Sequence, residues 1–255
     1  MLIQTASQNM VHIILTGATG LIGSAVLSSL IASPTVTRIS VMSRRPIPDA
    51  LTDAKVEVIL HHDYHFYPTS ILARLDGASG CIWAQGKSSV GMAEPDYTAL
   101  THDWPIAAAK AFANIGGREE GRNMNFVYIS GEGADPTGSS RQLFARIKGL
   151  TEKDLIMAAE RTPGLSTYNL RPAGVDASDS KPRFDRKRTT LELFYGLLYP
   201  ILRNVAPRYV TPVKSLADVA VGLAIGDGKP LLPAVDIEAQ GWTLRNLAIR
   251  RMAGL

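Results

Sequence analysis

Three glycines near the start of the chain have the spacing of a phosphate-binding turn. They follow the apolar run 11–15 in the pattern G-x-x-G-x-x-G. A turn without side chains lets the backbone approach a pyrophosphate, and the helix that it opens presents free N–H groups and a partial positive charge. The pattern therefore predicts a dinucleotide-binding turn made of Gly17, Thr19, Gly20, Leu21, Ile22 and Gly23. The alternative is a tight strand-to-helix turn without a ligand.

The end of the second expected strand indicates which dinucleotide binds. Ser43, Arg44 and Arg45 stand about twenty positions after Gly23, where an acidic residue would accept hydrogen bonds from the ribose of NAD. Arginines at this position suit a 2′-phosphate, through charge-assisted hydrogen bonds. The sequence therefore predicts NADP(H) as the cofactor, with these three residues at its phosphate. A solvated basic turn is the alternative interpretation.

A histidine-rich stretch follows the third expected strand. In dinucleotide-binding folds the end of the third strand lies beside the adenine. Asp63 can accept a hydrogen bond from the adenine amino group there. The alternative is a metal site made of His61, His62, Asp63 and His65. We favour the first interpretation and expect no metal, because alternate residues at a strand end face opposite ways and the sequence holds no second ligand cluster.

Short apolar runs alternate with helical patterns, and these elements must position the motifs. The expected strands are rich in Val and Ile, as buried parallel strands are, and cover residues 11–16, 37–43, 55–61, 80–85, 124–130 and 165–170. Pro105 predicts a kink in a helix over 94–114, and Ser139 and Ser140 are good capping residues for a helix over 139–160. The alternation predicts an α/β fold, a doubly wound parallel sheet of the Rossmann type, with a ligand crevice at the carboxyl ends of its strands.

The last third of the chain has a different pattern. We expect one domain over residues 1–255, with a core at about 10–175 and 210–226 and a small substrate-covering lobe at about 176–209 and 227–255. Ser215 is expected to cap a helix that ends at Ile225, and a last helix is expected from Thr243 to Met252. The composition, 45% hydrophobic and 20% charged over 255 residues, is typical of a globular protein.

The segment after the fifth expected strand completes a recognisable series of motifs. The strand ends at Ser130, and the helix that follows carries Phe144 and Lys148, which are four residues apart and share one face. With these residues, the chain resembles the short-chain dehydrogenase/reductase superfamily, and more narrowly the atypical branch of Tat-interacting-protein-like oxidoreductases and their fungal relatives. The resemblance rests on the glycine turn, the arginines, Ser130 with the following G-A-D, the F-x-x-x-K-G run, and the segments 170–175 and 213–220.

The resemblance implies a role for each matching residue. Ser130 corresponds to the serine that donates a hydrogen bond to the reacting carbonyl. Lys148 corresponds to the lysine that holds the nicotinamide ribose and lowers the pKa of a catalytic tyrosine. The segment after the fourth strand, Ala84 to Gly86, would pass under the cofactor, and the segment from Pro172 to Val175 would line its nicotinamide end.

One departure from the family pattern bears directly on the chemistry. The pattern is Y-x-x-x-K, and its tyrosine position is Phe144 here. A phenyl ring carries no exchangeable proton, and a positioned general acid contributes roughly 10²- to 10⁴-fold in rate. Carbonyl reduction with NADPH therefore lacks its usual proton donor. The substitutes that the sequence offers are Tyr97, Tyr195, Tyr199 and Glu132.

Three functions are consistent with this pattern. The first is an NADPH-dependent enzyme that acts on a small carbonyl-type substrate, with water or another acid as the proton source. The second is a non-redox enzyme, an isomerase or cyclase, on the same scaffold. The third is a non-catalytic regulatory protein that senses NADP(H), an interpretation that Phe144 makes plausible. The resemblance to fungal relatives suggests secondary metabolism as the context.

Partners and location follow from composition. The formal net charge of +4 suits an anionic cofactor, and no nucleic-acid-binding motif is present. We expect a cytoplasmic protein, because the sequence shows no signal peptide and its single cysteine, Cys81, suits core packing. We expect it to be a monomer or a homodimer. A solvated surface is the favoured interpretation of one basic loop, and peripheral contact with an anionic membrane is the alternative. Its charged residues are Lys181, Arg183, Arg186, Lys187 and Arg188.

Overall fold

A mostly parallel sheet forms the centre of the computed structural model, which describes residues 11–47, 53–118, 121–178, 184, 199, 202 and 205–255. The sheet has eight strands in the order β3-β2-β1-β4-β5-β6-β10-β9, and every neighbouring pair is parallel except β10 with β9. The strands are β1 (Val11–Thr16), β2 (Val36–Ser43), β3 (Val56–Leu60), β4 (Ala78–Trp83), β5 (Met124–Ile129), β6 (Leu165–Arg171), β9 (Ile237–Glu238) and β10 (Thr243–Arg245).

The six strands that the sequence predicted are all present, and the predicted α/β class with a doubly wound sheet is confirmed. Every residue of β1, β4, β5 and β6 is buried, which explains their continuous apolar runs. The strand order reverses between β1 and β4. In open parallel sheets this reversal produces a crevice at the carboxyl ends of the strands.

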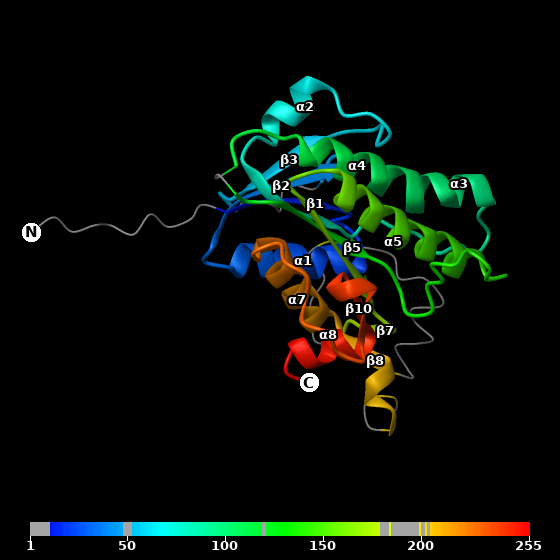
Figure 1. The fold of residues 1–255 in the computed structure, drawn as a ribbon. Helices are drawn as coiled ribbons and strands as arrows, with labels where there is room; N and C mark the ends of the chain where they lie inside the picture. Colours follow the sequence, from blue (N-terminus) through cyan, green and yellow to red (C-terminus); the bar gives the residue numbers. More distant parts are fainter. Residues whose placement is uncertain are drawn as a thin grey trace, which may run out of the picture.

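Helices cover both faces of the sheet (Figure 1). On one face lie α1 (Leu21–Ala32), α7 (Val213–Ile225) and α8 (Asn246–Met252), and on the other lie α2 (Thr69–Arg74), α3 (Glu94–Thr98), α4 (Trp104–Ala113) and α5 (Leu143–Arg161). Each face has its own apolar cluster, one built on α1 and α7 and the other on the aromatic side chains around α4. Cys81 is buried in β4 within the second cluster.

The kink predicted at Pro105 takes the form of a π-helical turn. Residues Ala99–Asp103 (η1) are π-helical and join α3 to α4. Proline has no N–H for the carbonyl four residues earlier, which here belongs to Thr101. That carbonyl accepts hydrogen bonds from the hydroxyls of Tyr128 (3.1 Å) and Thr151 (3.2 Å) instead. The neighbouring strand and helix thus satisfy the acceptor that Pro105 leaves open.

Two predicted helix starts are wrong. The helix predicted over 139–160 begins only at Leu143, because Ser139 Oγ (3.1 Å) and the Ser140 N–H (2.8 Å) bind the carboxylate of Asp135 and hold a loop. The helix expected after Ser215 already begins at Val213, with Pro212 as its N-terminal boundary. Ser215 therefore lies in the first turn of α7 and does not cap it.

The C-terminal segment also differs from the prediction of one helix from Thr243 to Met252. Thr243–Arg245 pairs with Asn169–Arg171 as β10, and the helix starts at Asn246. Pairing with β6 fixes these three residues as a strand, so tertiary contact overrides the local helical pattern. A second, two-stranded sheet joins β7 (Gly174–Asp176) to β8 (Val210–Pro212), and η2 (Pro207–Tyr209) precedes β8.

Candidate functional site

The glycine turn lies at the point where the strand order reverses. Gly17 has a φ of 71°, which disfavours other residues, and a Cβ there would lie 2.6 Å from the carbonyl oxygen of Ala84. A Cβ on Gly23 would lie 2.1 Å from the carbonyl oxygen of Gly17, and one on Gly20 would lie 3.2 Å from that atom. The turn is therefore packed so tightly between β1, β4 and α1 that Gly17 and Gly23 admit no side chain.

The first turn of α1 has no side-chain cap, and it faces the same crevice. Its N-cap residue is Gly20, which has no side chain, and the first turn contains no acidic residue. The N–H groups of Leu21, Ile22 and Gly23 therefore have no partner within the helix, while Thr19 is exposed beside them. Such an end attracts an anion through its N–H donors and its partial positive charge.

The predicted phosphate-binding residues lie at the carboxyl end of β2, next to β1. Ser43 Oγ donates to the carbonyl of Arg45 at 2.7 Å and so closes a local turn. Arg45 is exposed, whereas Arg44 is half-buried and its guanidinium carbon lies 5.4 Å from the centre of the Trp104 ring. The guanidinium groups of Arg44 and Arg45 therefore follow the carboxyl end of β2, and β2 pairs with β1, the strand that leads into the glycine turn.

The histidine-rich stretch lies beside aromatic rings. The His61 ring packs against the rings of Tyr64 and Tyr67, and burial lowers the pKa of His61. Asp63 lies three residues after the end of β3, and its carboxylate accepts the N–H of His65 at 2.9 Å. Within the described ranges, no group of three or more His, Cys, Asp or Glu side chains could hold a metal ion.

The segment after β4 packs against the glycine turn. Ala84 contributes the backbone that contacts Gly17, whereas a Cβ on Gly86 would meet nothing within 4 Å. The Nε2 atom of Gln85 and the Oγ1 atom of Thr16 are buried and have no hydrogen-bond partner in the described part of the chain. Polar atoms of this kind need a bound group or water.

Ser130 and Lys148 come together at the carboxyl end of β5. Lys148 Nζ donates to the Ser130 carbonyl at 2.7 Å. Gly149 makes this approach possible, because a Cβ there would lie 2.0 Å from the backbone of Asp135. The Ser130 side chain is 3% exposed, and its Oγ has no hydrogen-bond partner among the described residues. A buried hydroxyl of this kind needs a bound group or water as its partner.

The charge of Lys148 is held in a poorly hydrated place. Loss of hydration lowers its pKa to about 8, and the nearby carboxylate of Glu152 offsets part of that effect. Glu152 is itself buried and accepts three hydrogen bonds from Arg171, two from Nε (2.9 and 3.1 Å) and one from Nη2 (2.5 Å). Lys148 can thus hold or release a proton close to neutral pH.

Phe144 stands one turn before Lys148, and the residues considered as its substitutes serve other contacts. Tyr97 is buried with a raised pKa. Glu132 binds Arg245 (2.9 Å) and the Asn246 N–H (3.1 Å). Tyr199 lies against Gly174, where a Cβ would approach its ring within 3.1 Å. Tyr195 and the basic residues predicted in the loop 176–188 lie outside the described residues.

The segment from Pro172 to Val175 is positioned by contacts that the sequence did not reveal. The Pro172 carbonyl accepts the N–H of Glu132 at 2.9 Å. Asn246, which is buried, accepts the N–H of Ala173 (2.9 Å) and the hydroxyl of Thr211 (2.7 Å), and it donates to the carbonyl of Arg208. No local signal marks an asparagine for this role, so only the fold could reveal it.

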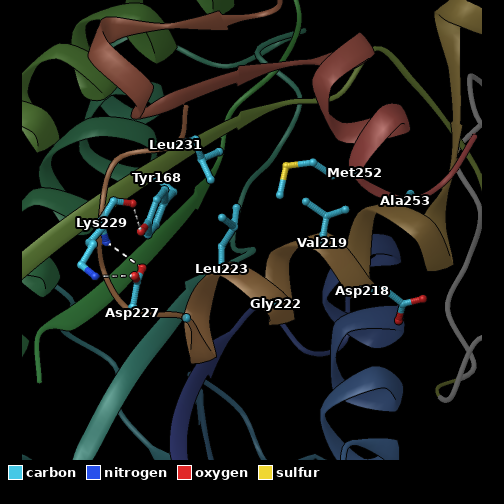
Figure 2. A pocket seen from close by; sticks show the side chains of 11 residues that line it. Tyr168, Asp218, Val219, Gly222, Leu223, Asp227, Lys229, Leu231, Met252 and Ala253 are labelled. Atoms are coloured by element: carbon cyan, nitrogen blue, oxygen red, sulfur yellow. Dashed lines mark hydrogen bonds and ion pairs between the residues drawn. The ribbon is translucent and has the colours of Figure 1, made fainter. Parts of the chain in front are cut away.

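A separate cavity of about 410 Å³ lies away from this crevice (Figure 2). Residues of α7 and the end of α8 line it, with Tyr168 and Lys229 at one end. Gly228, next to Lys229, lies beside Asn125 and Ser166. These two residues are at the amino ends of β5 and β6, whereas Ser130 follows the carboxyl end of β5. None of the predicted site residues lines this cavity, so we place the candidate site in the crevice.

Sequence comparison identifies relatives over most of the chain, although no family model matches it. The "Leucinostatins biosynthesis cluster protein T" of Purpureocillium lilacinum is 30% identical in an alignment 243 residues long, which covers 86% of this chain and 86% of the relative. The "Protein fmp52, mitochondrial" of Emericella nidulans is 34% identical over 61% of this chain and 67% of its own length.

The sequence predicted a cytoplasmic protein, and that location stays a prediction. Among the described residues, no helix has the length and apolar character that crossing a membrane requires.

Solved structures share the fold at low identity. An oxidoreductase of the short-chain dehydrogenase/reductase family from Burkholderia thailandensis superposes with a TM-score of 0.63 at 15% identity, over 96% of both chains. The enzyme WbmF of Bordetella bronchiseptica, in complex with NAD+, has a TM-score of 0.63 at 12% identity, over 98% of this chain and 80% of its own. The PhqB reductase domain from Penicillium fellutanum also has a TM-score of 0.63, at 15% identity over 84% of this chain, which spans 64% of that domain.

Proposed function

This chain belongs to the family of Leucinostatins biosynthesis cluster protein T and protein fmp52, and from that premise we propose that it binds NADP(H) and acts on a small carbonyl-type molecule as a short-chain dehydrogenase/reductase. The observation that carries this proposal is the glycine turn, in which a Cβ on Gly17 would meet Ala84 at 2.6 Å. The uncapped start of α1 faces the same crevice. The resemblance to the Tat-interacting-protein-like branch belongs to the proposal as well.

We propose that the crevice holds a dinucleotide along its length. Gly17 to Gly23 would hold the pyrophosphate, Arg44 and Arg45 the 2′-phosphate, and Asp63 the adenine. Ala84 and Gly86 would pass under the cofactor, and Pro172 to Val175 would line its nicotinamide end. The fold of WbmF, which was solved with NAD+, supports a nicotinamide cofactor, and the arginines support the phosphorylated form.

The chain supplies polarisation and a proton at the carboxyl end of β5. A reduced nicotinamide, when bound, supplies hydride. The unpartnered hydroxyl of Ser130 donates a hydrogen bond to the substrate carbonyl oxygen and stabilises the negative charge that develops there. We assign the proton to the Lys148 ammonium, because Phe144 has none and the pKa of Lys148 is about 8. A pKa close to the working pH suits a general acid.

The biological context that we propose is secondary metabolism. Leucinostatins biosynthesis cluster protein T and "Botcinic acid biosynthesis cluster B protein 16" of Botryotinia fuckeliana both carry a biosynthesis cluster in their names. The latter is 33% identical over 52% of this chain. A small organic molecule, rather than a macromolecule, is the substrate that this context favours.

Phe144 favours one second candidate function, a protein that senses NADP(H) or performs non-redox chemistry. The two candidates separate in one experiment. NADPH consumption is measured against a panel of aldehydes and ketones, and the binding of NADPH is measured by calorimetry. We expect the parent protein to turn over at least one carbonyl, and Ser130→Ala to lower that turnover about 100-fold with unchanged NADPH affinity.

Each outcome of this experiment has a separate meaning. Binding of NADPH without its consumption by the parent protein would support the second candidate, sensing or non-redox chemistry, instead. Folded protein that binds no pyridine nucleotide would overturn both candidates. Turnover that Ser130→Ala leaves unchanged would remove Ser130 from the proposed mechanism.

A further inference from the structure

Arg44 is held by an aromatic ring and not by a carboxylate. Its guanidinium carbon lies 5.4 Å from the centre of the Trp104 ring. In the part of the chain that the structure describes, Arg44 forms no ion pair and no hydrogen bond. A guanidinium over an indole face is attracted by the ring quadrupole, and its N–H groups stay free for an anion. Arg44 is therefore ordered but still available to a phosphate.

Trp104 is in turn fixed from behind. Its ring stacks on Tyr64 with centres 5.4 Å apart and an interplanar angle of 27°. Tyr64 is completely buried and contacts Trp83 edge-on at 5.7 Å. Trp104 directly follows the π-helical turn that ends at Asp103. A π-turn changes which face of a helix a residue occupies, and such turns often occur at functional sites.

Two polar groups beside Arg44 lack an acceptor. The indole Nε1 of Trp104 and the hydroxyl of Tyr64 are buried and have no hydrogen-bond partner among the described residues. Both groups can donate. Arg44 adds a positive charge, which acts on the Tyr64 hydroxyl. Arg44 therefore supplies the positive charge that favours an anionic acceptor at the end of β2.

We propose that Trp104 is a specificity-determining residue, which positions Arg44 for the 2′-phosphate of NADP(H) and so favours this cofactor over NAD(H). This inference rests on the cofactor in the proposed function. It assigns a residue of α4, distant in sequence from the arginines, to the selection of the cofactor. Arg45, which is exposed and contacts no ring, contributes less to this selection.

A double-mutant cycle on the full-length protein tests the proposal. The dissociation constants of NADP+ and NAD+ are measured by calorimetry for the parent, Arg44→Ala, Trp104→Leu and the double variant. We expect Arg44→Ala to weaken NADP+ binding roughly 10- to 100-fold and Trp104→Leu to weaken it about 3- to 10-fold. NAD+ binding should change less than about twofold. In the Arg44→Ala background, Trp104→Leu should have no further effect on NADP+.

Trp104→Phe keeps an aromatic face and controls for packing, and thermal unfolding checks that each variant is folded. We expect Trp104→Phe to retain most of the preference for NADP+. Equal weakening of both cofactors in Trp104→Leu would overturn the proposal, because it indicates a structural role. A loss of selectivity in Arg44→Ala but not in Trp104→Leu would overturn it while leaving the proposed cofactor intact. Equal affinity of the parent for NADP+ and NAD+ would remove both.

Discussion

The glycine turn and the contacts around Asn246 position opposite parts of the same crevice, and they are built in different ways. The turn is complete within a few consecutive residues between β1 and α1. Asn246 instead joins Ala173, Thr211 and Arg208 across the ends of separate elements. The proposed cofactor end of the crevice is therefore encoded locally, and the proposed substrate end depends on long-range contacts.

This difference has a functional consequence. A phosphate needs backbone N–H groups and an uncapped helix, which a short motif supplies by itself. A substrate needs a pocket whose shape is set by several segments. The chain can thus keep one cofactor while its substrate end changes. Variants in each region test whether the two are separate in this way.

The largest expected effect lies in the long-range region, at the ion pair of Arg171 and Glu152. Both side chains are buried, and Arg171 also reaches Glu238 at 2.8 Å. Arg171→Leu leaves the Glu152 carboxylate buried and unpaired, which costs about 3–5 kcal/mol. Urea denaturation should show this loss in the free energy of unfolding.

The exposed pair of Arg38 and Glu57 is the matched control. Arg38 donates to Glu57 at 2.9 Å, and its side chain is 44% exposed. Because water screens such a pair, Arg38→Leu should lower the free energy of unfolding by at most about 1 kcal/mol. Equal losses in both variants would show that burial does not distinguish the two ion pairs.

The next effect lies in the local region, at Gly17. An alanine there must adopt a left-handed φ, at about 1–2 kcal/mol, and its Cβ would meet the Ala84 carbonyl at 2.6 Å. We expect Gly17→Ala to lower the free energy of unfolding by about 2–3 kcal/mol and to weaken NADPH binding about 100-fold. Denaturation and calorimetry measure the two effects.

Gly91 separates backbone strain from steric conflict. Its φ of 76° resembles that of Gly17, but a Cβ there meets nothing within 4 Å. Gly91→Ala should therefore show the conformational cost alone, about 1–2 kcal/mol, with unchanged NADPH affinity. If Gly17→Ala binds NADPH as tightly as the parent, the turn does not hold the cofactor.

The two regions also differ in what the sequence could predict. The strands β1, β4, β5 and β6 were predictable because every residue in them is buried, and burial on both faces requires continuous apolar runs. The glycine turn was predictable because a positive φ and close packing require glycine at Gly17 and Gly23. Ser130 and Lys148 were identified by resemblance, and the structure places them in contact.

The remainder depends on contacts that no local pattern records. Ser139 and Ser140 are good caps in isolation, but Asp135 binds both and delays the start of α5. Residues 243–245 have helical neighbours but pair with β6. Asn246 and Glu152 are polar residues of ordinary type, and only their buried partners show their roles. Trp104 gave no sign that it would reach Arg44 from another element.

A smaller effect is expected at Asn246. Asn246→Ala removes acceptors from the Ala173 N–H and the Thr211 hydroxyl, and we expect a loss of about 1–3 kcal/mol in the free energy of unfolding. If the regions are separate, KM for a carbonyl substrate should rise while the dissociation constant of NADPH stays the same. Asn114→Ala, an exposed residue with one bond to the Lys110 carbonyl, is the control. A rise in the NADPH dissociation constant of Asn246→Ala would contradict the separation.

The last prediction concerns the pH dependence of kcat and Lys148, which lies where the two regions meet. Burial lowers its pKa to about 8, so the ammonium loses its proton as the pH rises through that value. A general acid must be protonated, so kcat should be constant below about pH 7 and should fall about tenfold per pH unit above pH 8. Phe144→Tyr adds a second acid on the same helix face, and we expect it to raise kcat and to move the decline to higher pH. A profile that stays flat from pH 6 to 10 in the parent would exclude Lys148 as the proton donor, and the proton would then come from water.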